Sequence, residues 1–510
     1  MSVAAHKIIP NSYRDSVALM QLSARLSALP GVESASVIMA TPANLGLARE
    51  AGLVDAEVRA SLSDLLIALR AKTADAARVA VEEAQRALAA GERRAASQGP
   101  GRMAPRSLQM ALAAQPEANL ALISTPGEYA AAEALKALRL GLHVMLFSDN
   151  VTLEDEVMLK REAERHGLMV MGPDCGTAIV AGVPLGFANA VRRGPIGVIG
   201  ASGTGVQLVT SLIDQAGLGI SHAFGTGGRD LSVEVGGATM LRALDALAED
   251  ADTRVIVLVS KPPARAVAEK VLQRAAETGK PVIACFLGAD AAEVKSRGVR
   301  AASTLDEAAA MALAAARGTP YVRAEHPMPP VAANLKPNQR YIRGLYSGGT
   351  FCYEATLLLS QALEDVRSNT PVGAAAKLAD VWHSSRHTLL DLGDDEFTRG
   401  RPHPMIDQRL RNERLAREAA DPEVAVILLD VVLGYGAHPD PAAEIVPAIR
   451  AARAASARRD PAIVGFVCGT ERDPQGLARQ TAALQEAGTI LAQSNAHAAR
   501  IAAAIATNHP

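Results

Sequence analysis

The sequence has few aromatic residues, no excess charge of either sign and no long apolar run. Aromatic residues make up 3% of its 510 residues, so a platform for stacking bases is not expected. The 52 Lys and Arg residues nearly balance the 54 Asp and Glu residues, and the formal net charge of −2 leaves no overall positive field for non-specific nucleic-acid binding. No segment reaches about 18 uninterrupted apolar residues, so we predict no membrane span. We therefore expect neither a nucleic acid nor a membrane among the partners of this chain.

Cysteine is also scarce and widely spaced. The four cysteines, at positions 175, 285, 352 and 468, form no Cys-x-x-Cys pair, so neither a zinc site nor a thioredoxin-type site is predicted. The first ten residues lack the charged segment and apolar core of a secretory signal. The sequence thus predicts a cytoplasmic protein with free, reduced thiols.

The apolar side chains are sufficient for several folded domains. With 49% hydrophobic and 21% charged residues, the composition is that of a globular protein of about three or four domains. Residues 1–95 alternate short strands with helices, which predicts a small α+β domain of the ferredoxin-like kind, and the polar residues 91–106 are typical of a linker. Buried strands then alternate with helices, which predicts a Rossmann-like unit over residues 107–190.

The rest of the chain contains an internal repeat. A strand, a Gly-rich turn and a helix start occur at residues 197–204 and again at residues 344–350, with Gly203 aligned to Gly349. The buried runs 255–259 and 281–288 recur in the same order as 424–429 and 462–469. We therefore predict two flavodoxin-like units, copy one over residues 191–318 and copy two over residues 341–510. The proline-rich residues 319–340 form the predicted linker between them.

Both Gly-rich turns are candidate anion-binding sites. Glycine lets the backbone approach an anion, and the following helix offers free N–H groups and the positive end of its dipole. The alternative is a plain tight turn between strand and helix. No Gly-Lys-Ser/Thr follows either turn, so neither is a P-loop. The candidate binding residues are Ser202, Gly203 and Thr204 in copy one and Ser347, Gly348, Gly349 and Thr350 in copy two.

A second Gly-rich loop follows the next strand of copy one. Gly227 and Gly228 stand beside Arg229, which can bind a phosphate or carboxylate through two hydrogen bonds. The alternative interpretation is a loop with a surface pair between Arg229 and Asp230.

The corresponding loop of copy two, residues 391–407, is the densest polar cluster in the chain. Arg401 could bind an oxyanion, and His403 could move a proton or carry a phosphoryl group. Asp394 and Glu396 could hold a divalent cation such as Mg²⁺. Together with Arg229, the predicted catalytic residues are His403, Arg401 and Asp395, while the alternative is an exposed, salt-bridged loop. Because strand ends share one edge of a parallel sheet, Asp430 and His438 are expected to meet the His403 loop.

These motifs resemble two related families. The order of residues 172–176, 202–204 and 227–230 is similar to that in the α-subunit of succinyl-CoA synthetase, an ADP-forming acyl-CoA synthetase, over about residues 111–313. The more specific resemblance is to the FdrA family, on residues 221–231, 347–352 and 400–407, and it spans most of the chain. The fold that this resemblance implies is a Rossmann-like CoA-binding-type domain and two flavodoxin-like, ligase-CoA-type domains behind the N-terminal α+β domain.

The chain departs from the synthetases at their functional motifs. The resemblance would put their phosphohistidine after the strand at residues 282–288, but residues 289–303 contain no histidine. Their first Gly-rich CoA loop has no counterpart before Ser107, and no segment is long enough for the nucleotide-binding ATP-grasp domain. We therefore do not expect a self-sufficient CoA ligase.

The resemblance implies a cytoplasmic enzyme subunit of the transferase or ligase type, working with other subunits of a hetero-oligomer. Proteins of the FdrA type are associated with oxamate carbamoyltransferase, so the expected substrates are an acyl or carbamoyl phosphate and a carboxylate acceptor. CoA and a nucleotide are further expected ligands. The alternatives are a subunit of an ADP-forming acyl-CoA synthetase and a non-catalytic scaffold or ligand-sensing subunit.

Overall fold

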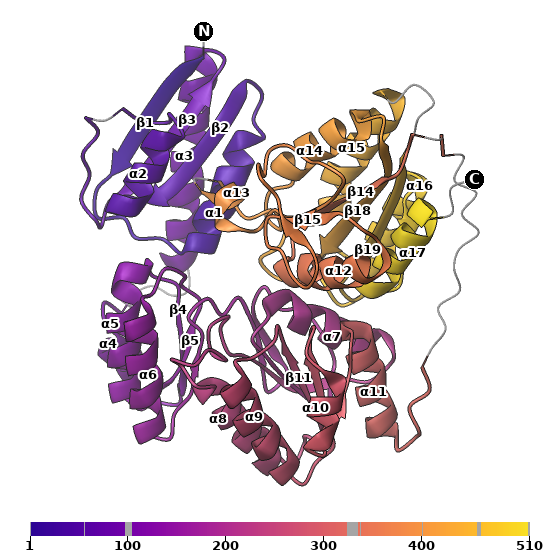
Figure 1. Ribbon diagram of the computed structural model, residues 1–510. Coiled ribbons are helices and arrows are strands. Elements are labelled where there is room, and N and C mark those ends of the chain that lie inside the picture. The colour runs from indigo at the N-terminus through magenta and orange to yellow at the C-terminus, as the bar shows by residue number, and fades with distance from the viewer. Residues whose placement is uncertain are drawn as a thin grey trace.

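The structure is a computed structural model of the 510-residue chain, and it describes residues 2–55, 57–96, 105–323, 335–336, 338–399, 401–455 and 461–507. Figure 1 shows four units in space: an N-terminal domain, a Rossmann-like unit below it, copy one beside that unit and copy two above copy one. Within the described ranges, no helix is long and apolar enough to cross a membrane.

The N-terminal domain is a three-stranded antiparallel sheet with helices on both faces. Its sheet order is β1-β3-β2, and the central strand β3 is buried on both faces because α1 and α3 cover one side and α2 the other. The predicted small α+β domain is confirmed, but α2 was not predicted, and α3 continues to Ala96 into the segment expected to be a linker. Residues 97–104 of that linker lie outside the described residues. The elements are β1 (Val3–Ile9), α1 (Ser16–Ser27), β2 (Val32–Met39), α2 (Pro42–Glu50), β3 (Leu65–Ala71) and α3 (Ala74–Ala96).

The Rossmann-like unit is a parallel sheet of three strands in the order β4-β5-β6. After β6, a cis peptide bond joins Gly172 to Pro173, and the chain turns into the hairpin of β7 and β8. Strand β7 pairs with β10, so this hairpin belongs to the sheet of copy one rather than to the unit that precedes it. The elements are α4 (Leu108–Ala114), β4 (Leu120–Ile123), α5 (Gly127–Arg139), β5 (His143–Leu146), α6 (Leu153–Arg165), β6 (Val170–Met171), β7 (Thr177–Val180) and β8 (Val183–Gly186).

Copy one is a seven-stranded sheet in the order β13-β12-β11-β9-β10-β7-β8. Its strands β9 to β13 are parallel, and β11 is buried along its whole length between helices. The elements are β9 (Arg193–Gly200), α7 (Gly203–Gln215), β10 (Ile220–Gly225), α8 (Ala238–Glu249), β11 (Val255–Ser260), α9 (Arg265–Glu277), β12 (Val282–Phe286), α10 (Ala291–Ser296), β13 (Arg300–Ala301) and α11 (Leu305–Arg317).

Copy two repeats this arrangement in the order β16-β15-β17-β14-β18-β19-β20. Strands β20, β19, β18, β14 and β17 take the places of β13, β12, β11, β9 and β10, so the predicted duplication is confirmed. The elements are β14 (Tyr341–Tyr346), α12 (Gly349–Ala362), β15 (Val366–Ser368), β16 (Ala376–Lys377), β17 (His387–Asp391), α13 (Asp395–Thr398), α14 (Arg409–Ala420), β18 (Val424–Val432), α15 (Pro441–Ala455), β19 (Ala462–Cys468), α16 (Leu477–Glu486), β20 (Ile490–Leu491) and α17 (Asn495–Thr507).

The two copies share one hydrophobic core. Helices α7 and α11 of copy one pack against α12 and α17 of copy two, and Val206, Ala308, Phe351 and Ile501 belong to a single buried cluster. This packing brings the Gly-rich turns at the start of α7 and α12 next to each other, as Figure 1 shows for the two helices.

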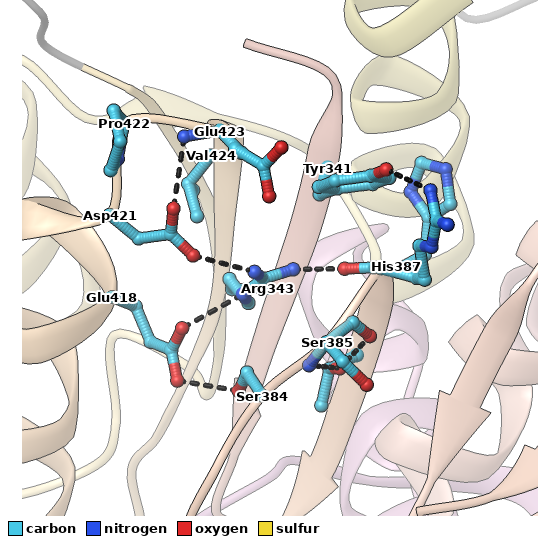
Figure 2. A network of polar contacts seen from close by, with 12 residues as sticks. Tyr341, Arg343, Ser384, Ser385, His387, Glu418, Asp421, Pro422, Glu423 and Val424 are labelled. Atoms are coloured by element: carbon cyan, nitrogen blue, oxygen red, sulfur yellow. Dashed lines mark hydrogen bonds and ion pairs between the residues drawn. The ribbon is translucent and has the colours of Figure 1, made fainter. Parts of the chain in front are cut away.

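A buried ion network fixes the opposite, amino-terminal edge of the copy-two sheet (Figure 2). Arg343 in β14 donates hydrogen bonds to Glu418 at 2.8 Å and to Asp421 at 2.9 Å, which ties α14 to the sheet. Glu418 also accepts from Ser384 at 2.6 Å. Because Arg343, Glu418 and Asp421 are all paired with an opposite charge, we assign this network a structural role.

Candidate functional site

The two Gly-rich turns contact each other across the boundary between the copies. The hydroxyl oxygens of Ser202 and Thr350 lie 2.6 Å apart, although 148 residues separate them in the chain. A Cβ atom on Gly348 would stand 3.1 Å from the methyl carbon of Thr204, so glycine allows this close approach. Both turns join a strand to a helix, as expected, and their helices begin at one place in the molecule.

The turn of copy one keeps free backbone donors. Ser202 caps α7 by accepting a hydrogen bond from the Gly205 amide at 3.0 Å. In the part of the chain that the structure describes, no group accepts from the N–H of Ser202, Gly203 or Thr204. Free amides at the start of a 13-residue helix suit the phosphate end of an acyl phosphate, a nucleotide or CoA.

The turn of copy two is filled by the protein itself. The buried carboxylate of Asp430 accepts hydrogen bonds from the Ser347 amide, the Ser347 hydroxyl and the Gly348 amide, each at 2.8 Å. Buried Arg411 donates to the same carboxylate at 2.8 Å and balances its charge. A second carboxylate, that of Asp391, lies 2.5 Å from the point where a Cβ on Gly349 would stand. The structure thus corrects the expectation that the Ser347 and Gly348 donors bind an external anion, because the Asp430 carboxylate occupies them. Anion binding at Gly349 and Thr350 stays a prediction.

The strand registers explain the difference between the turns. Ile199 pairs with Leu258 and Phe224 in copy one, and the aligned Leu345 pairs with Leu429 and Leu390 in copy two. One residue further along, copy one has Gly225 and Val259 where copy two has Asp391 and Asp430. We refer to Asp391 and Asp430 below as the acid pair of copy two.

The loop after β10 holds Arg229 against the Rossmann-like unit. The Arg229 guanidinium donates to Glu156 at 2.9 Å and to the Val151 carbonyl at 2.8 Å, and its side chain stays 47% exposed. A Cβ on Gly227, which has φ +85°, would lie 2.5 Å from the Pro173 carbonyl oxygen. The alternative interpretation, a surface pair between Arg229 and Asp230, is wrong. Asp230 is fully buried, and its carboxylate accepts a hydrogen bond from Lys160 at 2.8 Å. Two donor groups of Arg229 are therefore already in use, which weakens its assignment as an anion ligand.

His403 lies beside the copy-two turn as a neutral imidazole. Burial lowers the pKa of His403 to about 4. Its Nδ1 accepts a hydrogen bond from the Met405 amide at 3.2 Å, so in the neutral ring the proton stands on Nε2. Nε2 is 2.6 Å from the point where a Cβ on Gly393 would stand, and the Ser347 carbonyl oxygen and an Asp391 carboxylate oxygen lie 3.1 and 3.2 Å from that point. In this tautomer Nε2 carries an N–H donor, and the Nδ1 lone pair is already used by the Met405 amide.

Asp391 is an acid that the sequence did not single out. Burial raises its pKa to about 6, Asp394 and Asp430 raise it further, and the Gly393 amide at 3.0 Å and the charge of Lys261 act against this. A carboxyl group with a pKa near neutrality can accept and return a proton.

Lys261 was also missed. It follows β11 of copy one directly, its ammonium lies 5.1 Å from the centre of the Tyr353 ring, and its charge acts on Asp391. Its position just after a fully buried strand was the available signal, since such strand ends carry the ligand sites of α/β sheets.

The remaining predicted residues spread around this centre. Asp395 is exposed on α13, and its charge helps raise the pKa of Asp174 to about 6, after burial and Asp149. The loop of Asp395 therefore faces the Gly172–Pro173 turn. Arg401 is exposed two residues before His403, and His438 meets this loop through its amide, which donates to the Met405 carbonyl at 2.8 Å. The expected contact between the His438 and His403 loops is thus confirmed.

The structure offers little for a metal at Asp394 and Glu396. Asp394 caps α13 by accepting from the Glu396 amide at 3.1 Å, and Glu396 is exposed. Across the described ranges, no group of three or more His, Cys, Asp or Glu side chains is placed to hold a metal ion. Cys175 is no nucleophile, because burial raises the pKa of its thiol to about 12.

Comparison with known proteins agrees with this architecture. Three family models match: "AllF, heavy metal-associated domain" over residues 1–104, "CoA binding domain" over residues 191–288 and "CoA-ligase" over residues 345–505. The uncharacterized protein YahF of Escherichia coli K12 is 44% identical over 504 residues, which cover 97% of both chains. The chain belongs to the FdrA-like family of CoA-ligase-related proteins. The CoA-binding model thus covers most of copy one, whereas the sequence had placed a CoA-binding-like unit over residues 107–190.

More distant relatives share parts of this family's chain. The α-subunit 1 of the ADP-forming succinate–CoA ligase of Archaeoglobus fulgidus is 28% identical over 189 residues, which cover 36% of this chain and 63% of the subunit. The dinucleotide-forming acetyl-coenzyme A synthetase 1 of Ca. Korarchaeum cryptofilum is 16% identical over 76% of this chain and 82% of its own, with a TM-score of 0.34. The two family models and the ligase relative show a scaffold like that of the acyl-CoA synthetases, and those relatives are enzymes.

The N-terminal domain does not fit the heavy metal that the name of its family model mentions. Residues 1–104 contain no cysteine and one histidine, His6. Soft metals need thiolate or imidazole ligands, which this domain cannot supply in sufficient number. We derive no step from a metal there.

Proposed function

We propose that this chain is a subunit of an acyl-phosphate-handling transferase, with carbamoyl phosphate as donor and a small carboxylate such as oxamate as acceptor. The observation that carries the proposal is the unlike chemistry of the two facing turns. Copy one presents free amides and Lys261, and copy two presents the acid pair and neutral His403. An anionic donor and an acceptor that must lose a proton need these two environments side by side.

The phosphate of the donor fits copy one. The N–H groups of Ser202, Gly203 and Thr204 stand without an acceptor among the described residues at the start of α7, and Lys261 adds a cation at the end of the neighbouring strand β11. Acceptor attack on the carbamoyl carbon breaks the bond to the phosphate oxygen, and inorganic phosphate leaves with the negative charge. Donors already in place for that charge lower the barrier.

The proton of the attacking nitrogen fits copy two. Above a pH of about 6, Asp391 is ionised and can accept that proton, and the Nε2–H of His403 can donate to a developing oxyanion or hold the acceptor carboxylate. Arg401 would reach the same carboxylate from the exposed side of the loop. Asp430 stays out of the chemistry because four hydrogen bonds hold its carboxylate.

An ADP-forming acyl-CoA synthetase subunit is the second candidate, and the family models favour it. Bound CoA would place its phosphates on the same amides of copy one and would supply the thiol that accepts the acyl group. The absence of histidine from residues 289–303 counts against a phosphohistidine relay at that loop. A non-catalytic scaffold or ligand-sensing subunit is the third candidate.

The test is an assay of the complex purified with its partner subunits. We expect phosphate release from carbamoyl phosphate that depends on oxamate, without CoA or ADP. Lys261→Ala should raise KM for carbamoyl phosphate. Lys261→Arg should bring KM part of the way back to the wild-type value, because the cation returns. Asp391→Asn should lower kcat by about 10²-fold or more at unchanged KM. Activity that needs CoA and nucleotide would favour the second candidate, and full activity in both variants would favour the third.

A further inference from the structure

A separate cavity of about 260 Å³ lies between the two copies. Its walls come from the ends of β12 and β13 in copy one and from α12 and α17 in copy two, and they include Phe286, Ala289 and Leu357. Of the residues described above as the candidate site, none lines this cavity. Most of its surface is alkyl, so polar groups within it call for an explanation.

One of these groups is a buried acid. Glu354 of α12 is almost fully buried, and its carboxylate accepts hydrogen bonds from the Leu305 amide and the Asn495 side-chain amide, both at 2.8 Å. Burial raises the pKa of Glu354 to about 7, and the charge of Asp306 acts in the same direction. Each oxygen keeps a lone pair beyond the hydrogen bond that it accepts, so the carboxylate can take a further donor.

Two arginines also line the cavity, Arg323 after α11 and Arg500 on the facing helix. Arg500 of α17 lines the cavity with its side chain 40% exposed, and its charge acts on Glu354. Its ion pair with Asp306 is long, at 4.0 Å, so most of its donors remain for a ligand. The cavity thus brings together an acid, guanidinium cations and an apolar wall.

We propose that this cavity binds a small apolar α-amino acid such as valine or leucine. The ligand carboxylate lies on Arg500, its ammonium on Glu354 and its side chain against Phe286 and Leu357. An α-amino acid carries both charges next to each other, so it compensates both groups at once. A simple carboxylate would place a second negative charge beside Glu354, and a simple amine would place a second positive charge beside Arg500. This inference does not depend on the proposed function.

Calorimetric titration of the full chain with L-leucine and L-valine tests the proposal. The probes for each half of leucine are 4-methylpentanoate, which lacks the ammonium, and isoamylamine, which lacks the carboxylate. We expect the amino acids to bind at least about tenfold more tightly than either probe, since each probe loses one charge-assisted hydrogen bond. Binding should also raise Tm, because the ligand contacts both copies.

Two variants locate the site without disturbing the core. Arg500→Gln should weaken leucine binding about tenfold or more, whereas Arg265→Gln, at an 85% exposed arginine outside the cavity, should leave it unchanged. Ala289→Trp, at an exposed position on the cavity wall, should block binding while Tm of the free protein stays close to the wild-type value. Equal binding of 4-methylpentanoate, unchanged binding in Arg500→Gln or Ala289→Trp, or no binding of either amino acid would overturn the proposal.

Discussion

Copy one and copy two share a sheet order and a Gly-rich turn, but they differ at the two positions that flank that turn. Copy one has Gly225 and Val259 there, and its turn amides remain open. Copy two has Asp391 and Asp430, and Asp430 binds the amides of its own turn. The repeated turn thus has two different environments, one with open amides and one in which an internal carboxylate accepts from the Ser347 and Gly348 amides.

The largest expected effect comes from breaking the filled turn. Asp430→Ala removes the carboxylate that balances Arg411 and leaves a fully buried guanidinium without its charged partner. We expect the free energy of unfolding to fall by about 3–5 kcal/mol, measured by chemical denaturation. The matched change in copy one, Val259→Ala, removes only apolar contact and should cost about 1.5–2 kcal/mol. Equal losses in the two variants would contradict the difference we describe.

Substitutions in the copy-two loop, residues 391–407, should affect activity far more than stability. Arg401→Ala should lower transfer activity by about 10²-fold, with a change in unfolding free energy below about 1 kcal/mol. Arg450→Ala, at an exposed position on α15, is the control for loss of a surface cation. Trp382, the single tryptophan of the chain, packs edge-on against Phe397 of α13, with 5.1 Å between the ring centres. Its fluorescence therefore reports whether the loop keeps its place.

His403 allows a finer test of the same loop. His403→Ala should lose activity to the same degree as Arg401→Ala, whereas His403→Gln should retain a measurable part of it because the glutamine amide also donates a hydrogen bond. Complete inactivity of His403→Gln, with a stably phosphorylated or carbamoylated wild-type histidine, would instead make His403 a nucleophile.

The half-buried imidazole of His403 also predicts a pH dependence of stability. The folded pKa of His403, about 4, is below the ordinary value of 6.5, so between these pH values the unfolded chain binds a proton that the folded chain does not. The free energy of unfolding should therefore fall as the pH drops from 6.5 to 4, by about 2–3 kcal/mol from this residue, and level off below that. His403→Gln should lack this component when both proteins are unfolded by urea across the range. Parallel pH profiles would show that the imidazole is not desolvated.

The smallest expected effect concerns the contact between the turns. Ser202→Ala removes the cap of α7 and should cost about 1 kcal/mol. Thr350→Val removes only the partner hydroxyl at 2.6 Å. A double-mutant cycle should give a coupling energy of about 0.5–1.5 kcal/mol, and additive losses would show that the two hydroxyls do not interact in solution.

Much of the fold could be predicted because its signals are local. The buried runs of the sequence are strands in the structure, and the Gly-rich turns are junctions between a strand and a helix. The order of the repeat is the order in which corresponding strands take their places in the two sheets. Helix α2 was missed because its short sequence, with Gly46 inside it, has little helical periodicity; its Thr41 cap and Pro42 start were the available signals. The hairpin of β7 and β8 was missed because its partner strand lies about 40 residues further along the chain.

The candidate site shows the same division between what neighbouring residues encode and what contacts between distant residues decide. By itself, the sequence determined that glycine-containing turns begin α7 and α12 and that a polar loop follows β17, because glycine content, apolar runs and charge are properties of neighbouring residues. Only the tertiary structure decided that the Asp430 carboxylate would fill the Ser347 turn, 83 residues away, that the charge of Lys261 would act on Asp391, and that His403 would hold its proton on Nε2. Those outcomes depend on which strand ends become neighbours and on how much water the packing removes, and no local pattern of residues encodes either.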